Sequence, residues 1–255
     1  MEEKDKHKPI LKYSKTSKPP RKTKAEYDKF SPWIWIDIES SGLDSSRSEI
    51  LEIYVVVTDY NLEPKDHLHL VIHHPLNVLL AKSSLWCKRH FGSVSYGGNG
   101  LFDECQFSNL SYVEAEHRLW DFFEFYSSHS VGTIRPGIGI KRPFFNKTMG
   151  ANGDNIQSHD LSHMPYASTN PHRLIMLAGS TVHFDRDFIL KYFPSIKRFL
   201  NHKVIDVTSL LESARRFRPE SLEMLPKPNS KHRAKEDIYD SIALFKYLKN
   251  NVFNA

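Results

Sequence analysis

The segment from Pro32 to Glu39 is apolar except for two carboxylates, Asp37 and Glu39, that lie two residues apart. Three isoleucines share one face of this predicted strand, and Trp33, Trp35, Asp37 and Glu39 share the other. Residues 50–59 are rich in β-branched side chains, and residues 67–73 alternate enough to form a third strand. Short turn-rich segments join these stretches. The pattern therefore predicts three consecutive antiparallel strands.

After residue 73 the apolar spacing changes to three and four residues, which favours helices. In chain order the predicted elements are helices at 78–86 and 113–126, a buried strand at 173–178, a helix from about 184 to 192, a strand at 203–206, a helix through 216, and an amphipathic helix at 234–250. The fold class is α/β: a mixed five-stranded sheet flanked by helices.

The length of 255 residues and a hydrophobic content of 40% suit one substantial domain. We assign residues 1–30 to a basic disordered tail and residues 31–255 to the domain. Residues 127–172 are rich in Gly, Pro, Asn and His, and loops of this length are uncommon in compact domains. We interpret that segment as an insertion or a mobile lid.

The distribution of charge and the lack of certain glycine-rich motifs exclude several classes of function. The first thirty residues hold ten Lys or Arg against five Asp or Glu, which accounts for the whole formal charge of +5. A body without excess positive charge is not built to hold long duplexes by pairing phosphates. The absence of glycine-rich phosphate motifs also disfavours nucleotide-triphosphate and dinucleotide cofactors.

The same features bear on the compartment. Cys87 and Cys105 lie far apart, without the spacing of a disulfide framework or a thiolate metal site, which indicates a reducing compartment. No apolar run approaches the ~18 residues needed to span a bilayer. We expect a soluble intracellular protein in the cytoplasm, with the nucleus and the mitochondrion as alternatives; residues 18–24 resemble a nuclear address.

Asp37 and Glu39 place two carboxylates side by side on one face of an otherwise apolar strand. Burying like charges together is costly unless a cation compensates them or one of them takes up a proton. A solvated strand face fits poorly, because tryptophans extend the carboxylate face. The segment therefore predicts a divalent metal site.

Further candidates occur later in the chain. Asp185 follows a predicted strand at the start of a helix, where ligand crevices form in α/β sheets, although a capping aspartate is also common there. Asp237 lies one turn into the last predicted helix and follows His232 by five residues. A histidine in the preceding loop and this aspartate can point into one pocket.

Asp37, Glu39, Asp185, His232 and Asp237 stand in the order and local settings of the DEDDh 3′-to-5′ exonucleases, and the surrounding words most resemble oligoribonuclease. The similarity is carried by the segments 35–43, 50–59, 206–220 and 232–241. It implies an RNase H-like fold and two-metal hydrolysis of short single-stranded RNA to nucleoside 5′-monophosphates.

The resemblance also implies roles for the five residues. The four carboxylates would hold two Mg²⁺ or Mn²⁺ ions, because hard cations take oxygen ligands. Asp37 would bridge both ions, Glu39 and Asp237 would hold the ion that carries the attacking water, and Asp185 would support the other. His232 would accept the proton of that water, since histidine suits proton transfer near neutrality.

For substrate binding, the resemblance assigns Leu43 to a wedge against the terminal bases. It places His202 and Lys203 where the family has an aromatic residue and an arginine that cap the 5′ phosphate across a homodimer interface, and Thr181 and Thr208 where it often has serines. Lysine lacks the planar two-pronged contact of arginine, so this departure weakens the expectation of a dinucleotide preference.

Three alternatives remain open from the sequence. A 3′-end trimming exonuclease would use the same chemistry on longer RNA or single-stranded DNA. A non-catalytic RNA-binding scaffold of the same fold would have no need of all five residues. A zinc site would use His159 and His163 with His172 or His183, but Pro165 disfavours the helix that would align the first two.

Overall fold

The computed structural model describes residues 32–128, 174–229 and 231–253. Its centre is one sheet in the order β3-β2-β1-β4-β5. The strands are β1 (Trp33–Ser40), β2 (Ile50–Thr58), β3 (Pro64–Val71), β4 (Ile175–Gly179) and β5 (Leu200–Asp206). Strands β1 to β3 pair antiparallel, whereas β4 runs parallel to β1 and β5 parallel to β4. The predicted mixed five-stranded sheet is confirmed.

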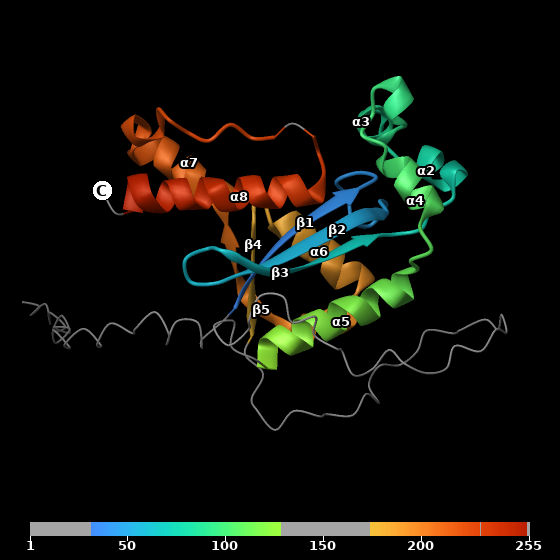
Figure 1. Cartoon of the computed structure of the whole chain (residues 1–255), viewed down its shortest axis with the longest axis horizontal. Coiled ribbons are helices and arrows are strands. Elements are labelled where there is room, and N and C mark those ends of the chain that lie inside the picture. The colour runs from blue at the N-terminus through green and yellow to red at the C-terminus, as the bar shows by residue number, and fades with distance from the viewer. Residues whose placement is uncertain (1–31, 129–173, 230, 254–255) are drawn as a thin grey trace, which may run out of the picture.

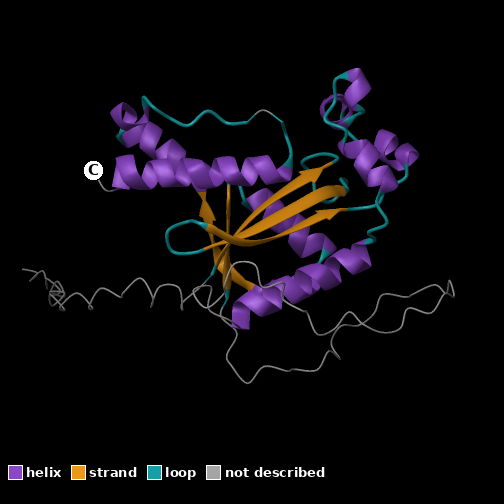
Figure 2. Cartoon of the chain, in the orientation of Figure 1, coloured by secondary structure: helices purple, strands orange, loops and turns teal. Residues whose placement is uncertain are grey.

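Helices cover both faces of this sheet (Figure 1). Helices α5 (Tyr112–Ser128) and α6 (His183–Tyr192) lie on one face, and α7 (Val207–Phe217) and α8 (Ala234–Leu248) lie on the other. Figure 2 shows the strands as a layer between these two pairs of helices.

The period-two pattern of β1 divides its side chains between two cores. Ile34 and Ile36 are buried with residues of α5 and α6. Trp35 is fully buried on the opposite face with residues of α8, and its indole nitrogen donates a hydrogen bond of 3.0 Å to the Thr58 hydroxyl. The strand is therefore anchored on both faces, which fixes where its carboxylates lie.

A third apolar cluster forms at one end of the sheet, around helices α2 (Leu76–Lys82), α3 (Leu85–Phe91) and α4 (Leu101–Phe107). The short 3₁₀ helix η1 (Val94–Tyr96) lies between α3 and α4 in the chain. We predicted one helix over residues 78–86, and this was wrong in detail. The helix breaks because Ser84 adopts an extended backbone and its hydroxyl caps α3 by accepting from the amide of Cys87. Helix α4 was not predicted.

The remaining elements are the 3₁₀ helices η4 (Pro194–Phe199) and η5 (Pro219–Leu222) and the π-helical turn η6 (Lys249–Phe253). The predicted tail, most of the predicted insertion, and His159, His163 and His172 of the alternative zinc site lie outside the described residues. No helix in the described part of the chain is both long and apolar enough to cross a membrane.

Candidate active site

Asp37 and Glu39 of β1 meet Asp237 of α8 on the face of the sheet that carries Trp35. One carboxylate oxygen from each of the three residues lies within 4.8 Å of the others. All three side chains are partly buried. This is the one group of metal-type ligands found within the described residues. The fold thus brings together three of the four carboxylates predicted from the sequence.

The fourth carboxylate, Asp185, lies in the first turn of α6 and is only 7% exposed. Its Oδ1 accepts a hydrogen bond of 2.8 Å from the amide of Ile38, the residue between the two acids of β1. Strand β4 pairs with β1 over Trp33–Trp35. Ile38 lies past the part of β1 that pairs with β4, and its amide donates to the side chain of Asp185 instead.

Gly179 allows the chain to leave β4 so close to β1. A Cβ atom at this position would lie 2.7 Å from the carbonyl oxygen of Ile36, closer than real Cβ atoms approach. Glycine is therefore required where β4 ends against β1, and α6, which carries Asp185, begins four residues later.

Burial and, to a smaller extent, mutual repulsion make the ionised forms of these acids unfavourable. Burial, together with the charges of Asp237 and Glu52, raises the pKa of Asp37 to about 8. Burial and the neighbouring charges of Asp37 and Asp237 raise the pKa of Glu39 to about 9. Burial, Asp240 and Glu236 raise the pKa of Asp237 to about 6. Burial and the charge of Asp37 also raise the pKa of Asp185.

A divalent cation fits this cluster because it would replace the protons that the raised pKa values hold there. The donor atoms are all carboxylate oxygens, the ligands that hard cations prefer. The predicted metal site is therefore consistent with the geometry and the electrostatics.

His232 lies two residues before the start of α8, with a left-handed backbone at φ 48°. Such a conformation costs a non-glycine residue about 1–2 kcal/mol and requires support from its surroundings. Its ring centroid lies 5.1 Å from that of Trp86 and 5.3 Å from that of His90. Among the described residues its imidazole forms these ring contacts and no hydrogen bond to the carboxylates.

Sequence reasoning missed two aromatic residues of α3 that adjoin His232. The rings of Trp86 and His90 are stacked with centroids 4.0 Å apart, and Trp86 remains 47% exposed. The available signal was a tryptophan beside polar residues in a predicted helix, but its proximity to His232 depends on the docking of α3.

Sequence reasoning also missed Glu52 and Arg233. Glu52 of β2 pairs directly with Glu39 and is 1% exposed. Burial alone would raise its pKa, but hydrogen bonds from His69 and Arg233 outweigh that effect and lower the pKa to about 2. Glu52 is therefore an ionised and compensated neighbour of the acid cluster.

The predicted substrate-binding residues occupy separate places. Leu43 follows β1 and is 76% exposed. Thr181 and Thr208 come together, with their hydroxyl oxygens 3.1 Å apart. His202 and Lys203 are exposed on β5, an edge strand of the sheet.

The carboxylate of Asp206 joins the two threonines. Its Oδ1 accepts from the amides of Thr181 at 2.9 Å and Thr208 at 3.0 Å, and the second bond caps the start of α7. Thr181 adopts a left-handed backbone with φ 56°. This unusual conformation is held by its bond to Asp206.

In sequence the chain is similar to oligoribonucleases over most of its length. A mitochondrial oligoribonuclease of Bos taurus is 28% identical over 221 residues, which cover 86% of this chain and 73% of the relative. An oligoribonuclease of Marinobacter nauticus is 28% identical over 220 residues, which cover 86% of this chain and 95% of the relative. The chain is a homologue of the oligoribonucleases. No family model matches it.

Solved structures with much lower sequence identity share the fold of this oligoribonuclease homologue. Exonuclease I of Methylocaldum szegediense superposes with a TM-score of 0.52 at 14% identity, over 87% of this chain. E. coli exonuclease I in complex with a dT13 oligonucleotide gives a TM-score of 0.52 at 11% identity, over 88% of this chain. The chain spans 41% and 42% of the lengths of those two structures. The predicted RNase H-like fold, a mixed five-stranded sheet flanked by helices, is confirmed.

Proposed function

We propose that this chain is a metal-dependent 3′-to-5′ exoribonuclease that hydrolyses short oligoribonucleotides to nucleoside 5′-monophosphates. The observation that carries the proposal is the cluster of Asp37, Glu39 and Asp237, whose carboxylate oxygens converge within 4.8 Å. Homology to the oligoribonucleases supports the choice of substrate. The predicted domain from residue 31 onward would carry this activity.

We further propose that Asp37, Glu39 and Asp237 hold two Mg²⁺ or Mn²⁺ ions, with Asp185 supporting one of them. Such ions would stabilise the attacking and leaving oxygens of the phosphodiester displacement. The carboxylates that would hold the ions lie on regular elements, namely β1 and the first turns of α6 and α8, which fix their positions. Asp185 also holds the backbone of β1 through its bond to Ile38.

His232 would act as the general base and accept a proton from the attacking water at a ring nitrogen. The ring is free to do so because its described contacts are with the faces and edges of Trp86 and His90 rather than with hydrogen-bonding groups. General-base catalysis typically contributes a factor of about 10²–10⁴ to the rate.

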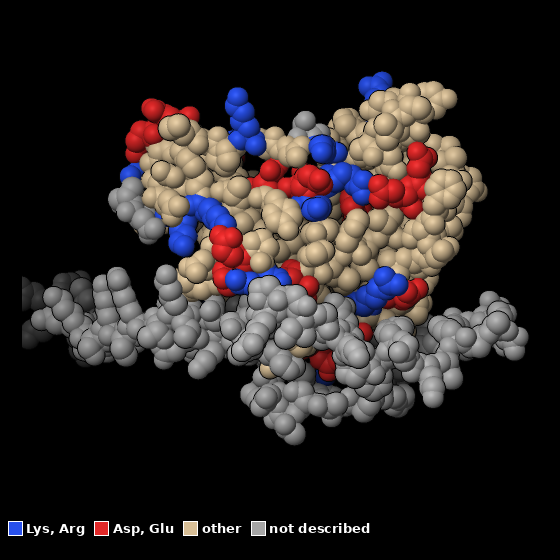
Figure 3. Space-filling view, viewed as in Figure 1, with Lys and Arg blue, Asp and Glu red and all other residues tan. Residues whose placement is uncertain are grey.

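The exposed side chains around the site suit a single strand. Leu43 and Trp86 offer apolar surface on which bases would rest, and stacking of a base on an aromatic ring is worth about 1–3 kcal/mol. The paired hydroxyls of Thr181 and Thr208 would contact the strand bound to the same chain, whereas Lys203 and His202 would contact the 5′ phosphate of the substrate bound to the partner. Figure 3 shows acidic and basic side chains interspersed on one face rather than a broad basic surface, which agrees with a short substrate.

Assembly and compartment follow from the resemblance. We propose a homodimer in which His202 and Lys203 on the edge strand β5 reach the partner's substrate. We place the activity in the cytoplasm, and the mitochondrial names of relatives make the mitochondrion the alternative. Sedimentation and cell fractionation test these two points separately.

The decisive experiment is Mg²⁺-dependent digestion of 5′-labelled RNAs of about two, five and twenty nucleotides, with matched DNA and an Asp37→Ala control. Rapid loss of the shortest RNAs, absent in the control, is the expected result. Cleavage of only the long substrates would make the chain a 3′-end trimming exonuclease. Failure to cleave any substrate with Mg²⁺ or Mn²⁺ would leave an RNA-binding scaffold.

A further inference from the structure

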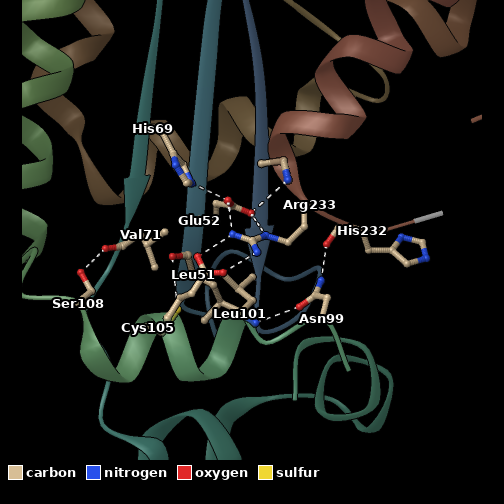
Figure 4. A network of polar contacts seen from close by, with 12 residues as sticks. Leu51, Glu52, His69, Val71, Asn99, Leu101, Cys105, Ser108, His232 and Arg233 are labelled. Atoms are coloured by element: carbon tan, nitrogen blue, oxygen red, sulfur yellow. Dashed lines mark hydrogen bonds and ion pairs between the residues drawn. The ribbon is translucent and has the colours of Figure 1, made fainter. Parts of the chain in front are cut away.

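The backbone around His232 is anchored from elements that lie far away in the sequence. His232 has a left-handed backbone, and α8 begins two residues later, at Ala234. Figure 4 shows Asn99 and Glu52 converging on this short segment from the end of the sheet, whereas the His232 ring points away from both. The segment is therefore held through its main chain and through Arg233.

Asn99 supplies the first anchor. Its side-chain amide donates hydrogen bonds to the carbonyl of His232 at 2.8 Å and to the carbonyl of Lys231 at 3.1 Å. Its side-chain oxygen accepts from the amide of Leu101, the first residue of α4, at 3.0 Å. One side chain thus connects the start of α4 to the backbone of His232.

Glu52 and Arg233 supply the second anchor. The carboxylate of Glu52 accepts from Nη2 of Arg233 at 2.9 Å and from Nε at 3.0 Å, and it also accepts from the amide of Ala234 at 3.2 Å. His69 adds a bond of 2.7 Å to the same carboxylate. Arg233 also binds both oxygens of Glu104 on α4, at 2.7 and 2.8 Å.

The hydrogen bonds of Glu52 and Arg233 position the start of α8, although none of them is made to a carboxylate of the acid cluster. The side chain of Arg233, the residue that precedes α8, does not cap the helix, so the bond from the Ala234 amide to Glu52 satisfies a helix-start donor from another strand. Asp237 lies one turn further along, and its amide donates to the carbonyl of Arg233 at 3.1 Å. The ion pair therefore fixes the turn that presents Asp237.

We propose that Asn99 and the Glu52–Arg233 ion pair are positioning elements of the nuclease site: they hold the backbone of His232 so that its ring sits against Trp86 and faces the substrate. The inference rests on the proposed function for its catalytic consequence. The His232 ring has no hydrogen bond of its own among the described residues, so its placement depends on the backbone below it and on the rings beside it.

The test uses two substitutions at Asn99 in the full chain. Asn99→Asp keeps the acceptor for the Leu101 amide but loses the donor to His232, whereas Asn99→Ala loses both. Both variants should lower kcat for a five-nucleotide RNA by about ten- to a hundredfold while KM changes by less than about threefold, because misplaced catalytic groups cost rate rather than binding. Glu63→Gln, which removes an exposed ion pair between the residue before β3 and Lys246 of α8, is the control for a lost polar contact and should leave kcat unchanged.

A double-mutant comparison shows whether Asn99 acts through His232. In a His232→Ala background, Asn99→Asp should lower the remaining activity by less than about twofold, since two residues that act as a unit are not additive. A full additional loss in that background would overturn the proposal. So would a loss in Asn99→Ala that Asn99→Asp does not share, because the role would then be to cap α4.

A spectroscopic measurement separates this proposal from the proposed nuclease function. The ring protons of His232 lie beside Trp86, so their NMR shifts report that contact. In Asn99→Asp these shifts should move toward those of a Trp86→Ala variant, and unchanged shifts would refute the positioning role. A parent protein with no nuclease activity whose His232 shifts still move would refute the function and leave the positioning intact.

Discussion

Replacing Asp237 by asparagine should stabilise the metal-free protein while removing its activity. The pKa of Asp237 is raised from 3.8 to about 6 by burial and by the neighbouring carboxylates. At neutral pH this shift corresponds to about 3 kcal/mol of unfavourable charge, at about 1.4 kcal/mol for each pKa unit. Partial exposure of the carboxylate to solvent reduces that to about 1.5 kcal/mol.

One effect opposes this gain. Asp237 lies in the first turn of α8, where a negative charge interacts favourably with the helix dipole, by about 0.3–1 kcal/mol. Asparagine would keep the oxygen that accepts a hydrogen bond from the protonated Glu39. The net stabilisation expected for Asp237→Asn is about 1 kcal/mol, or about 2–4 °C in Tm for a domain of this size.

The sign of the pH dependence follows from the direction of the shift. A carboxyl group whose pKa is raised in the folded state contributes no penalty below its unfolded pKa near 3.8, and the folded state loses stability as pH rises toward 6. The difference between variant and parent should therefore be absent near pH 4, grow between pH 4 and 6, and stay constant above that range.

The assay is urea unfolding in EDTA at several pH values from 4 to 8, with Glu223→Gln as the control for an exposed carboxylate removed away from the acid cluster. Addition of Mg²⁺ should then stabilise the parent more than the variant, because ligand binding to the folded state adds stability. A variant less stable than the parent by the same amount at every pH would show that Asp237 is a structural residue and would refute this reasoning.

Asp37→Ala should abolish RNA hydrolysis without lowering Tm in EDTA, because it removes one of several mutually repelling carboxylates; digestion and thermal unfolding test this, and a large drop in Tm would contradict it. Mg²⁺ should raise the Tm of the parent but not that of Asp37→Ala, and an equal rise in both would place the metal elsewhere. Trp35→Ala should cost about 3–5 kcal/mol in urea unfolding, since this fully buried ring fills the core beneath α8, and a loss below 1 kcal/mol would mean that the site collapses readily. Trp86→Ala should leave stability nearly unchanged but raise KM for short RNA about five- to tenfold, because the ring is half-exposed and offers a stacking surface; an unchanged KM would remove Trp86 from the substrate path.

The elements of the sheet could be predicted because their signals are local. Alternation of side chains identified β1 and its carboxylate face, and apolar spacing located α5, α6, α7 and α8 within a few residues. The helices of the third cluster were predicted less well. Their boundary depends on the hydroxyl of Ser84 capping α3, and α4 is only seven residues long, so neither produces a strong periodic pattern.

The sequence by itself determined that Asp37 and Glu39 share one face of a strand, because side-chain direction in a strand depends only on spacing. Sequence similarity added Asp185, His232 and Asp237 as partners. Only the tertiary structure decided that Asp237 joins the pair on β1 while Asp185 binds the Ile38 amide. These relations depend on strand order and helix docking, which local periodicity does not encode.

The residues that anchor His232 show most clearly what only the tertiary structure decides. Arg233 and Glu52 are 181 residues apart, and Asn99 and His232 are 133 residues apart. The family similarity covers Glu52 and Arg233 but does not indicate that they pair, and Asn99 lies outside the similar segments. Their roles arise because folding places an ionised Glu52 beside Glu39 in a buried site, where its charge requires a partner and Arg233 provides one.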